Sequence, residues 1–315
     1  MTTRIRRPAL AMAALLAAGC TADDAPARGR PPQASAAPAT QRAECEVGKK
    51  GSSLENGLEE SSGLAESRTR PGVYWSHNDS GHGAELFLVA IDGRNLGRVE
   101  VEGATNHDWE DMAAGRCPGG AGECLYIADT GDNARGDQAG KQPAVRLAVV
   151  PEPAPGATKA RAREYEGLLP GGRTDIEAVA VLPDGRIYLV SKGLRNEVEL
   201  FRWPTPLRAD APVTLERVRQ LAPVAVALGD RVTGASASPN GRWVAVRTYA
   251  ALAFYRTEDL LGSGGPFAQL DLESLAEAQG EAVSLADDGT VVLTSEGPGH
   301  GLPGSIAHLR CVLPR

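Results

Sequence analysis

The chain is dominated by short runs of alternating hydrophobic and polar residues, separated by turns, which is typical of β-strands. One unit recurs: an apolar strand that begins at an anchor residue, an Asx-Gly turn and a second β-rich strand. Residues 177–192 align without a gap with residues 281–296, and residues 233–248 keep the same spacing. Since Asx-Gly between alternating runs is the strongest short-range hairpin pattern, each unit is predicted to contain a β-hairpin.

Further strands follow most of these hairpins, and two looser copies of the unit precede them. Third strands are predicted at residues 85–91, 198–203, 251–256 and 305–311, and fourth strands at 97–101 and 215–221. The five anchors are Ser62, Glu110, Glu177, Thr233 and Glu281. Repeated units of about four strands are typical of propeller blades. We therefore predict an all-β fold, a single β-propeller of about five blades. A sixth blade would fit between residues 110 and 177, and an open β-sandwich is the alternative fold.

Ring closure is predicted from the two ends of the folded region. The last unit stops at its third strand, so an N-terminal strand near Cys45 is expected to complete it, which leaves no free sheet edge. Besides Cys20, the chain has four cysteines, and an even number in an exported protein favours disulfides. A Cys45–Cys311 bond would lock the closed ring, and Cys117 could pair with Cys124 across a glycine-rich loop.

The first 44 residues are predicted to be an export and anchoring segment. Three arginines precede the apolar run 9–18, which is too short to span a bilayer, and the run ends at Cys20. Residues 16–20 resemble the lipobox of bacterial lipoproteins, which implies cleavage before Cys20 and its acylation; an ordinary secretory signal is the alternative. We expect a signal peptide at residues 1–19, the lipidated cysteine with a disordered Ala/Pro-rich tether at 20–44, and the propeller at 45–315. The protein would be exported and lipid-anchored to the cell envelope, at the outer membrane or the cell surface.

The charge of the chain limits its partners. The formal net charge is −7, and loss of residues 1–19 with their three arginines makes it −10. Such an acidic protein is not expected to bind nucleic acid. It could bind cations, or anions bridged by a metal. We expect a monomer.

Several motifs resemble a bacterial family of phytase-like and esterase-like β-propellers. The motifs lie at residues 60–65 with 75–81, at 108–111 with 128–133, and at 281–284 with 294–297. The resemblance spans residues 59–315. It implies calcium ions in the mouth of the channel and hydrolysis of phosphomonoesters, although no complete phytase ligand set can be matched.

Candidate ligands of a metal ion recur at equivalent positions of the repeat. In a propeller the first strand of each blade lines the axis, so the anchors and the ends of the second strands are expected near a shared mouth, among them His77, Asn78 and Asp79. Calcium prefers several carboxylate and carbonyl oxygens. The candidate ligands are Glu110, Asp111, Asp129, Asp132, Glu177, Glu281 and Glu296. The alternative is that these acids tie the blades together by pairing with basic groups and backbone amides.

Candidate catalytic residues are the basic groups at the same mouth. Lys192 and Arg247 could neutralise a phosphate or carboxylate, and His107 could move protons or act as a ligand. We therefore predict a calcium-assisted site that binds, and as an enzyme would hydrolyse, a small anionic, phosphate-ester-like ligand. The alternative is a non-catalytic scaffold that binds a protein or glycan partner in the cell envelope.

Overall fold

The computed structural model describes residues 40–314, except for residues 56, 132–143, 173 and 300. They belong to one compact unit, Ala39–Arg315. In this part of the chain, no helix has the length and apolar character needed to cross a membrane. The expected signal peptide and most of the expected tether lie outside the described residues.

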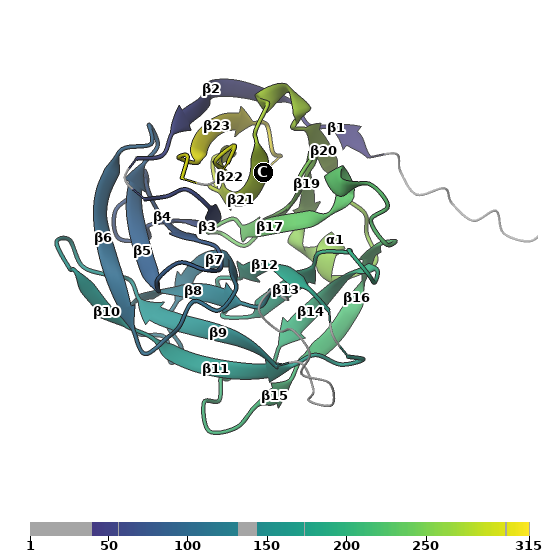
Figure 1. The fold of residues 1–315 in the computed structure, drawn as a ribbon. Helices are drawn as coiled ribbons and strands as arrows, with labels where there is room; N and C mark the ends of the chain where they lie inside the picture. The colour runs from purple at the N-terminus through teal and green to yellow at the C-terminus, as the bar shows by residue number, and fades with distance from the viewer. Residues whose placement is uncertain (1–39, 56, 132–143, 173, 300, 315) are drawn as a thin grey trace, which may run out of the picture. The chain divides into compact units, whose positions relative to one another are not determined.

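The unit consists of five β-sheets arranged around a common axis, as Figure 1 shows. Each sheet is one blade of a propeller, so the predicted fold is confirmed. Blade 1 contains β3 (Ser61–Glu66), β4 (Val73–Asn78), β5 (Glu85–Ala90), β6 (Asn95–Glu102) and, at its outer edge, β10 (Lys159–Arg161). Blade 2 contains β7 (Trp109–Arg116), β8 (Glu123–Asp129), β9 (Ala144–Pro151), β11 (Arg163–Leu168) and the outer β15 (Val213–Thr214).

The remaining three blades follow in the order of the chain. Blade 3 contains β12 (Ile176–Val181), β13 (Ile187–Ser191), β14 (Val198–Trp203) and β16 (Glu216–Ala222). Blade 4 contains β17 (Val232–Ala237), β18 (Trp243–Thr248), β19 (Ala251–Arg256), β20 (Ala268–Asp271) and the outer β1 (Gln41–Arg42). Blade 5 contains β21 (Gln279–Leu285), β22 (Thr290–Glu296), β23 (Ser305–Cys311) and β2 (Cys45–Ser53).

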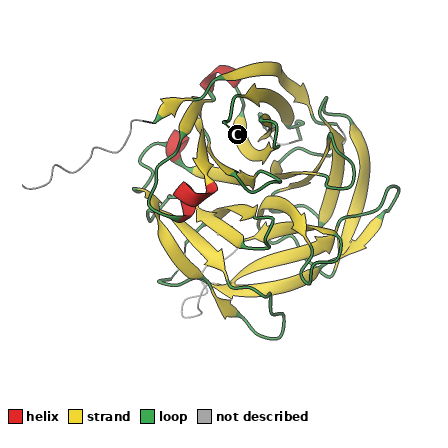
Figure 2. Ribbon diagram, turned by 180° about the vertical axis from the view of Figure 1, so that it is seen from behind, coloured by secondary structure: helices red, strands yellow, loops and turns green. Residues whose placement is uncertain are grey.

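Helical structure among the described residues is short and peripheral, as the view from behind in Figure 2 shows. It consists of the α-helix α1 (Thr257–Leu261) and the 3₁₀ turns η1 (Leu228–Asp230) and η2 (Glu273–Leu275). The strands therefore carry the core.

The hydrophobic core consists of five clusters, one between each pair of neighbouring blades. Successive side chains of a strand point to opposite faces of its sheet. In β7, Ala113 packs toward blade 3, whereas Met112 and Ala114 pack toward blade 1. Both faces of each blade are thus buried, which explains the apolar runs in the inner strands. The inner strands β3, β7, β12, β17 and β21 contact one another in a closed ring.

The ring closes where the sequence predicted it. The N-terminal β2 pairs antiparallel with β23, Cys45 lies opposite Cys311, and a disulfide joins the two cysteines. A second disulfide joins Cys117 to Cys124. β1, which we expected within the tether, instead pairs with β20 at the outer edge of blade 4.

The described part of the long interval between the second and third anchors does not hold a sixth blade. Of its described strands, β7, β8, β9 and β11 complete blade 2, and β10 adds to the edge of blade 1. The predicted third strands at 198–203, 251–256 and 305–311 agree residue by residue with β14, β19 and β23. Their uninterrupted alternation and flanking turns left little freedom in register.

The closing disulfide is predicted to stabilise the ring strongly. The double variant Cys45→Ser/Cys311→Ser should lower the free energy of unfolding by about 2–4 kcal/mol, because the bond constrains a long stretch of the unfolded chain. Its two cysteines are 266 residues apart. Urea unfolding followed by tryptophan fluorescence measures the change.

The matched control is Cys117→Ser/Cys124→Ser, which opens a bond between residues only 7 apart. A shorter loop gains less from a disulfide, so the control should lose less stability. An equal or larger loss in the control would contradict this account of ring closure.

Candidate functional site

A β-bulge in every blade directs one anchor residue of the repeat. In each inner hairpin the pairing shifts register at the anchor, so that it has no direct partner on the second strand. Bulges turn a side chain away from the regular alternation of a strand. The anchors are Ser62, Glu110, Glu177, Thr233 and Glu281. The five anchors therefore share a β-bulge as well as a position in the repeat.

The five anchors divide into two kinds. The hydroxyls of Ser62 and Thr233 donate to the backbone carbonyls of Glu110 and Glu281, the anchors of the next blades. These bonds tie blade 1 to blade 2 and blade 4 to blade 5. The other three anchors are glutamates, and each is at most 4 % exposed.

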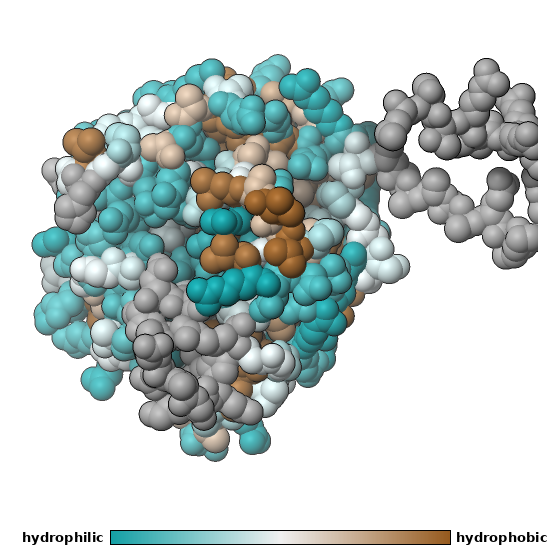
Figure 3. All heavy atoms as spheres, turned by 45° about the vertical axis from the view of Figure 1, so that its right-hand side comes forward, coloured by the Kyte–Doolittle hydropathy of each residue, from teal (hydrophilic) through white to brown (hydrophobic). Residues whose placement is uncertain are grey.

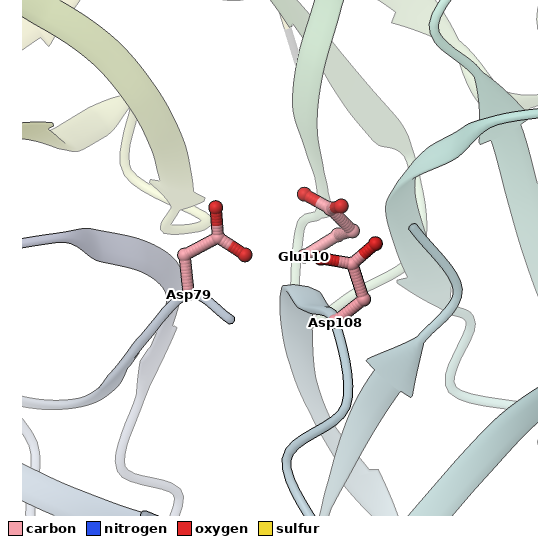
Figure 4. A group of neighbouring side chains, drawn as sticks. All are labelled: Asp79, Asp108 and Glu110. Carbon is pink, nitrogen blue, oxygen red and sulfur yellow. The ribbon is translucent and has the colours of Figure 1, made fainter. Parts of the chain in front are cut away.

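The carboxylates at one end of the channel form two groups that share Glu110. Asp79, Asp108 and Glu110 each offer an oxygen within 4.8 Å of the others, and so do Glu110, Asp175 and Glu177. Figure 4 shows the first group, in which Asp79 approaches the other two from blade 1. We call these the first and second triads. Carboxylate oxygens at such spacing are a donor set that a hard divalent cation accepts, so this acidic cluster could bind a metal ion.

Lys192 supplies a positive charge to the second triad. Its Nζ lies 2.7 Å from Glu177 Oε1 and 3.9 Å from Asp175 Oδ2. Burial alone would lower the pKa of Lys192, but the surrounding carboxylates raise it above its usual value. The ammonium group is therefore charged at any physiological pH, and it occupies the position a cation would take beside these two acids.

The carboxylate of Glu110 lacks such a partner. It is 4 % exposed, and it makes no hydrogen bond or ion pair with any residue that the structure describes. Burial, and then the charge of Glu177, raise its pKa well above the usual range. A Cβ on Gly131 would lie 1.8 Å from Glu110 Oε1 and 2.4 Å from Asp108 Oδ2, so glycine there leaves room for both carboxylates.

Two further acids from blade 5 extend the cluster. Glu281 accepts a hydrogen bond of 2.9 Å from Gln279 Nε2. Burial and the neighbouring Glu296 raise the pKa of Glu281 to about 8. Burial, and then Asp79 and Glu60, raise the pKa of Glu296 to about 7. Both carboxyls can therefore hold or release a proton near neutral pH, Glu296 near Asp79 of the first triad and Glu281 near Glu177 of the second.

Asp111, predicted as a metal ligand, has a different position. Its side chain is fully buried on the channel axis and accepts the N–H groups of Met112, Val179 and Ala235 at 2.8–3.0 Å. These donors come from blades 2, 3 and 4. Burial raises the pKa of Asp111, while the three N–H groups oppose that shift. Because its oxygens accept backbone N–H groups from three blades, Asp111 ties these blades together, and its predicted role as a metal ligand stays a prediction.

Asp129 and His107 form a pair whose acid is bonded to the backbone of the first triad. Asp129 Oδ1 accepts the backbone N–H of Asp108 and Oδ2 accepts His107 Nδ1, both at 2.9 Å. Arg146 lies 3.8 Å from the same carboxylate. The predicted ligand role of Asp129 and the predicted catalytic role of His107 stay predictions, since the structure shows only that the two side chains pair with each other. Asp132, another predicted ligand, lies outside the described residues.

Arg247 does not face the mouth either. It is fully buried, and its guanidinium donates to the carbonyls of Ala282 and Thr294 and to the carboxylate of Glu277. It therefore joins blade 4 to blade 5. Of the three predicted catalytic residues, the structure brings only Lys192 into the acid cluster.

Two acids of the triads were not predicted as ligands. Asp108 and Asp175 each precede a glutamate anchor by two residues, so that the pattern Asp-x-Glu occurs at 108–110 and again at 175–177. That repeated pair was visible in the sequence. Asp79 was expected to line the mouth but not to act as a ligand, and it completes the first triad from the end of β4.

No protein-family model matches the chain, and no curated protein matches it. Solved structures do resemble it in fold. An aldose sugar dehydrogenase from Streptomyces coelicolor, in its PQQ-bound form, has 14 % sequence identity and a TM-score of 0.51, and the match covers 88 % of this chain and 100 % of that one. A gluconolactonase from Xanthomonas campestris has 12 % identity and a TM-score of 0.44, with 88 % and 98 % covered. The first of these likenesses shows the β-propeller fold alone.

Replacement of Asp111 tests its role as a tie between blades. Asp111→Asn should lower the free energy of unfolding by about 1–3 kcal/mol, because an NH₂ group would face buried N–H donors and leave them unsatisfied. Asp184→Asn is the control, since Asp184 pairs with Arg186 at the surface and exposed ion pairs contribute about 0–1 kcal/mol. Denaturant unfolding of both variants decides the point; equal stability would contradict the role of Asp111.

Proposed function

We propose that this protein binds a divalent cation of the calcium class at the first triad, and through it a small anionic, phosphate-ester-like ligand. The observation that carries the proposal is the buried carboxylate of Glu110, which has no hydrogen-bond or ion-pair partner among the described residues. Burial and its acidic neighbours raise the pKa of this carboxyl, so that its ionised form is unfavourable without a nearby cation. A calcium ion with oxygen ligands from Asp79, Asp108 and Glu110 would compensate it.

The choice of the first triad over the second follows from Lys192. Its ammonium group already lies against Glu177 and Asp175, so a divalent ion placed in the second triad would be repelled. Among the described residues, no ion pair is formed by Asp79 or Glu110 of the first triad. One metal ion beside one fixed lysine is therefore the arrangement that fits the charges.

The ligand is proposed to be anionic because a bound cation would add positive charge to the acidic mouth. Without it, the carboxylates of the mouth outnumber the one lysine, and an anion would be repelled. With a cation on the first triad, a phosphate group would meet two positive charges, the metal ion and Lys192. A metal ion in such a position polarises the phosphoryl group and activates water when it is bound. Binding of the anion should then depend on the cation.

A second candidate function is hydrolysis of that ligand, and Glu296 favours it. The pKa of this carboxyl is raised to about 7, which suits a general acid or base at neutral pH. Water would attack phosphorus, the ester P–O bond would break, and the alcohol would leave with a proton. Glu296 would accept the proton from the water and return one to the alcohol.

The cellular place of the protein is part of the proposal. Cys20 would carry a lipid anchor in the envelope, and the residues up to Ala39 would connect it to the propeller. The support is the sequence of residues 1–20, with its arginines, its short apolar run and its cysteine.

Removal of the uncompensated carboxylate should abolish cation binding. Calorimetry should show one calcium ion per wild-type chain, and Glu110→Gln should weaken the affinity at least tenfold. Calcium at about 100 times its Kd should stabilise the wild type by about 2.7 kcal/mol, measured by denaturant unfolding. Asp92→Asn, at an exposed ion pair with Arg94, is the control and should bind like the wild type.

Two outcomes would decide against parts of this function. Failure of calcium, magnesium or manganese to bind or stabilise the wild type would rule out the cation site. Binding of calcium and phosphate without turnover of p-nitrophenyl phosphate would leave the binding function and exclude hydrolysis. If no anion binds the calcium-loaded protein, a non-catalytic scaffold becomes the better account.

Anchoring is tested separately by Cys20→Ser. The wild type should remain with the membrane fraction after washing with salt, and it should incorporate labelled palmitate when expressed in a lipoprotein-processing bacterium. The variant should be soluble and unlabelled, because no other cysteine is free: the remaining four are paired. Release of wild-type protein into the soluble fraction would contradict the anchor.

A further inference from the structure

A run of six apolar residues, 223–228, lies at the surface between β16 and β17. Val226 is 95 % exposed, Leu228 is 59 % and Val224 is 40 %. We call these three side chains the apolar ridge. Figure 3 shows hydrophobic residues gathered in a patch among hydrophilic ones on one side of the molecule. Consecutive exposed apolar residues are unfavourable in water unless they have a function.

Backbone hydrogen bonds join this segment to the rim of the acidic mouth. The N–H of Ala225 donates to the carbonyl of Gly193, the residue after Lys192, at 2.9 Å. On the other side, the N–H groups of Tyr249 and Ala250 donate to the carbonyls of Arg231 and Gly229 at 3.2 and 3.0 Å. The segment that carries the ridge is therefore held next to Lys192, the lysine of the second triad.

Tyr249 is a residue of intermediate polarity near both the acidic mouth and the apolar ridge. Its side chain is half-buried, and the pKa of its hydroxyl is raised by burial and by the nearby Glu281. The surface thus passes from carboxylates, through a tyrosine, to aliphatic side chains. An occupant that covers both ends would have an anionic group at the cation and an apolar group on the ridge.

The size of the ridge indicates what kind of occupant it fits. A protein partner needs about 800 Å² on each side, far more than three aliphatic side chains provide. One alkyl chain or one aromatic ring matches them. Because the Ala225 N–H bonds to Gly193, which follows Lys192, one molecule of sufficient length could reach from the mouth to the ridge.

We propose that the ligand of this protein is amphiphilic: a phosphate monoester whose apolar substituent lies against Val224, Val226 and Leu228. The inference rests on the proposed function, since the cation site holds the phosphate group. It adds the class of the ester: an alkyl or aryl phosphate rather than a fully polar one.

The test is a series of ligands measured by calorimetry with saturating calcium: inorganic phosphate, then methyl, butyl and octyl phosphate below micelle-forming concentrations. Burial of one methylene contributes about fourfold in affinity when complete. On an open ridge we expect at least about a tenfold gain from methyl to octyl phosphate in the wild type. The double variant Val226→Ser/Leu228→Ser should lose this gain and keep its affinity for inorganic phosphate.

The matched control is Val312→Ser, since Val312 is 70 % exposed near the C-terminus and away from the mouth; it should keep the gain. Both variants change exposed side chains, and thermal unfolding checks that they remain folded. An equal gain in the ridge variant, or no gain in a wild type that binds phosphate, would overturn the inference alone. Absence of phosphate binding would overturn the proposed function with it.

A membrane surface is the other occupant that the experiment separates. Sedimentation with phosphatidylcholine vesicles, using Cys20→Ser to remove the anchor, should show no difference between the wild-type ridge and the ridge variant. If the ridge variant loses vesicle binding while the alkyl-phosphate series is unchanged, the ridge contacts lipid and the proposed ligand class is wrong.

Discussion

The architecture depends on one buried carboxylate on the channel axis. Asp111 accepts backbone N–H groups from blades 2, 3 and 4, and the equivalent positions in the other blades are small: Gly63, Ala178, Gly234 and Ala282. Five inner strands cannot all place a side chain on one axis. A single acid fills that space, and it satisfies donors that would otherwise be buried without partners. The channel is filled at this level, so the triads lie in a mouth and not in an open pore.

The arrangement of carboxylates in the mouth is electrostatically unfavourable. Several carboxylates are crowded at low exposure, where like charges repel and desolvation penalises ionisation. The fold tolerates this because each blade repeats the same bulge and thus presents its anchor at the same level. Lys192 offsets part of the repulsion. Burial and the neighbouring acids raise the pKa of Glu110 well above its usual range, and a strongly perturbed carboxyl in a cluster of acids is more typical of a binding site than of a structural tie.

The sequence predicted the fold better than the site. Blades, ring closure and both disulfides follow from periodicity, spacing and parity, which are properties of local segments. The environment of each acid depends on the geometry of the bulge and on the groups that the fold brings next to it. Asp111 accepts three backbone amides and Asp129 pairs with His107, whereas Glu110 has no hydrogen-bond or ion-pair partner among the described residues. Adjacent residues 110 and 111 look alike in sequence but point to different environments. Only the repeated Asp-x-Glu pattern carried information about the triads in the sequence. Asp79 is distant from that pattern in the sequence and comes close to it only in the folded structure.

Ring closure and the site are physically coupled, because the mouth takes its acids from blades that the chain does not place next to each other. Glu296 of blade 5 lies near Asp79 of blade 1, and these blades meet only where the ring is closed. Repulsion between their carboxylates acts at this junction, whereas the Cys45–Cys311 bond holds β2 against β23 within blade 5, on the side that packs against blade 4. A cation that binds beside Asp79 would relieve the same repulsion. The disulfide therefore completes blade 5 permanently, whereas a cation beside Asp79 would relieve the repulsion between blades 5 and 1 only while it is bound.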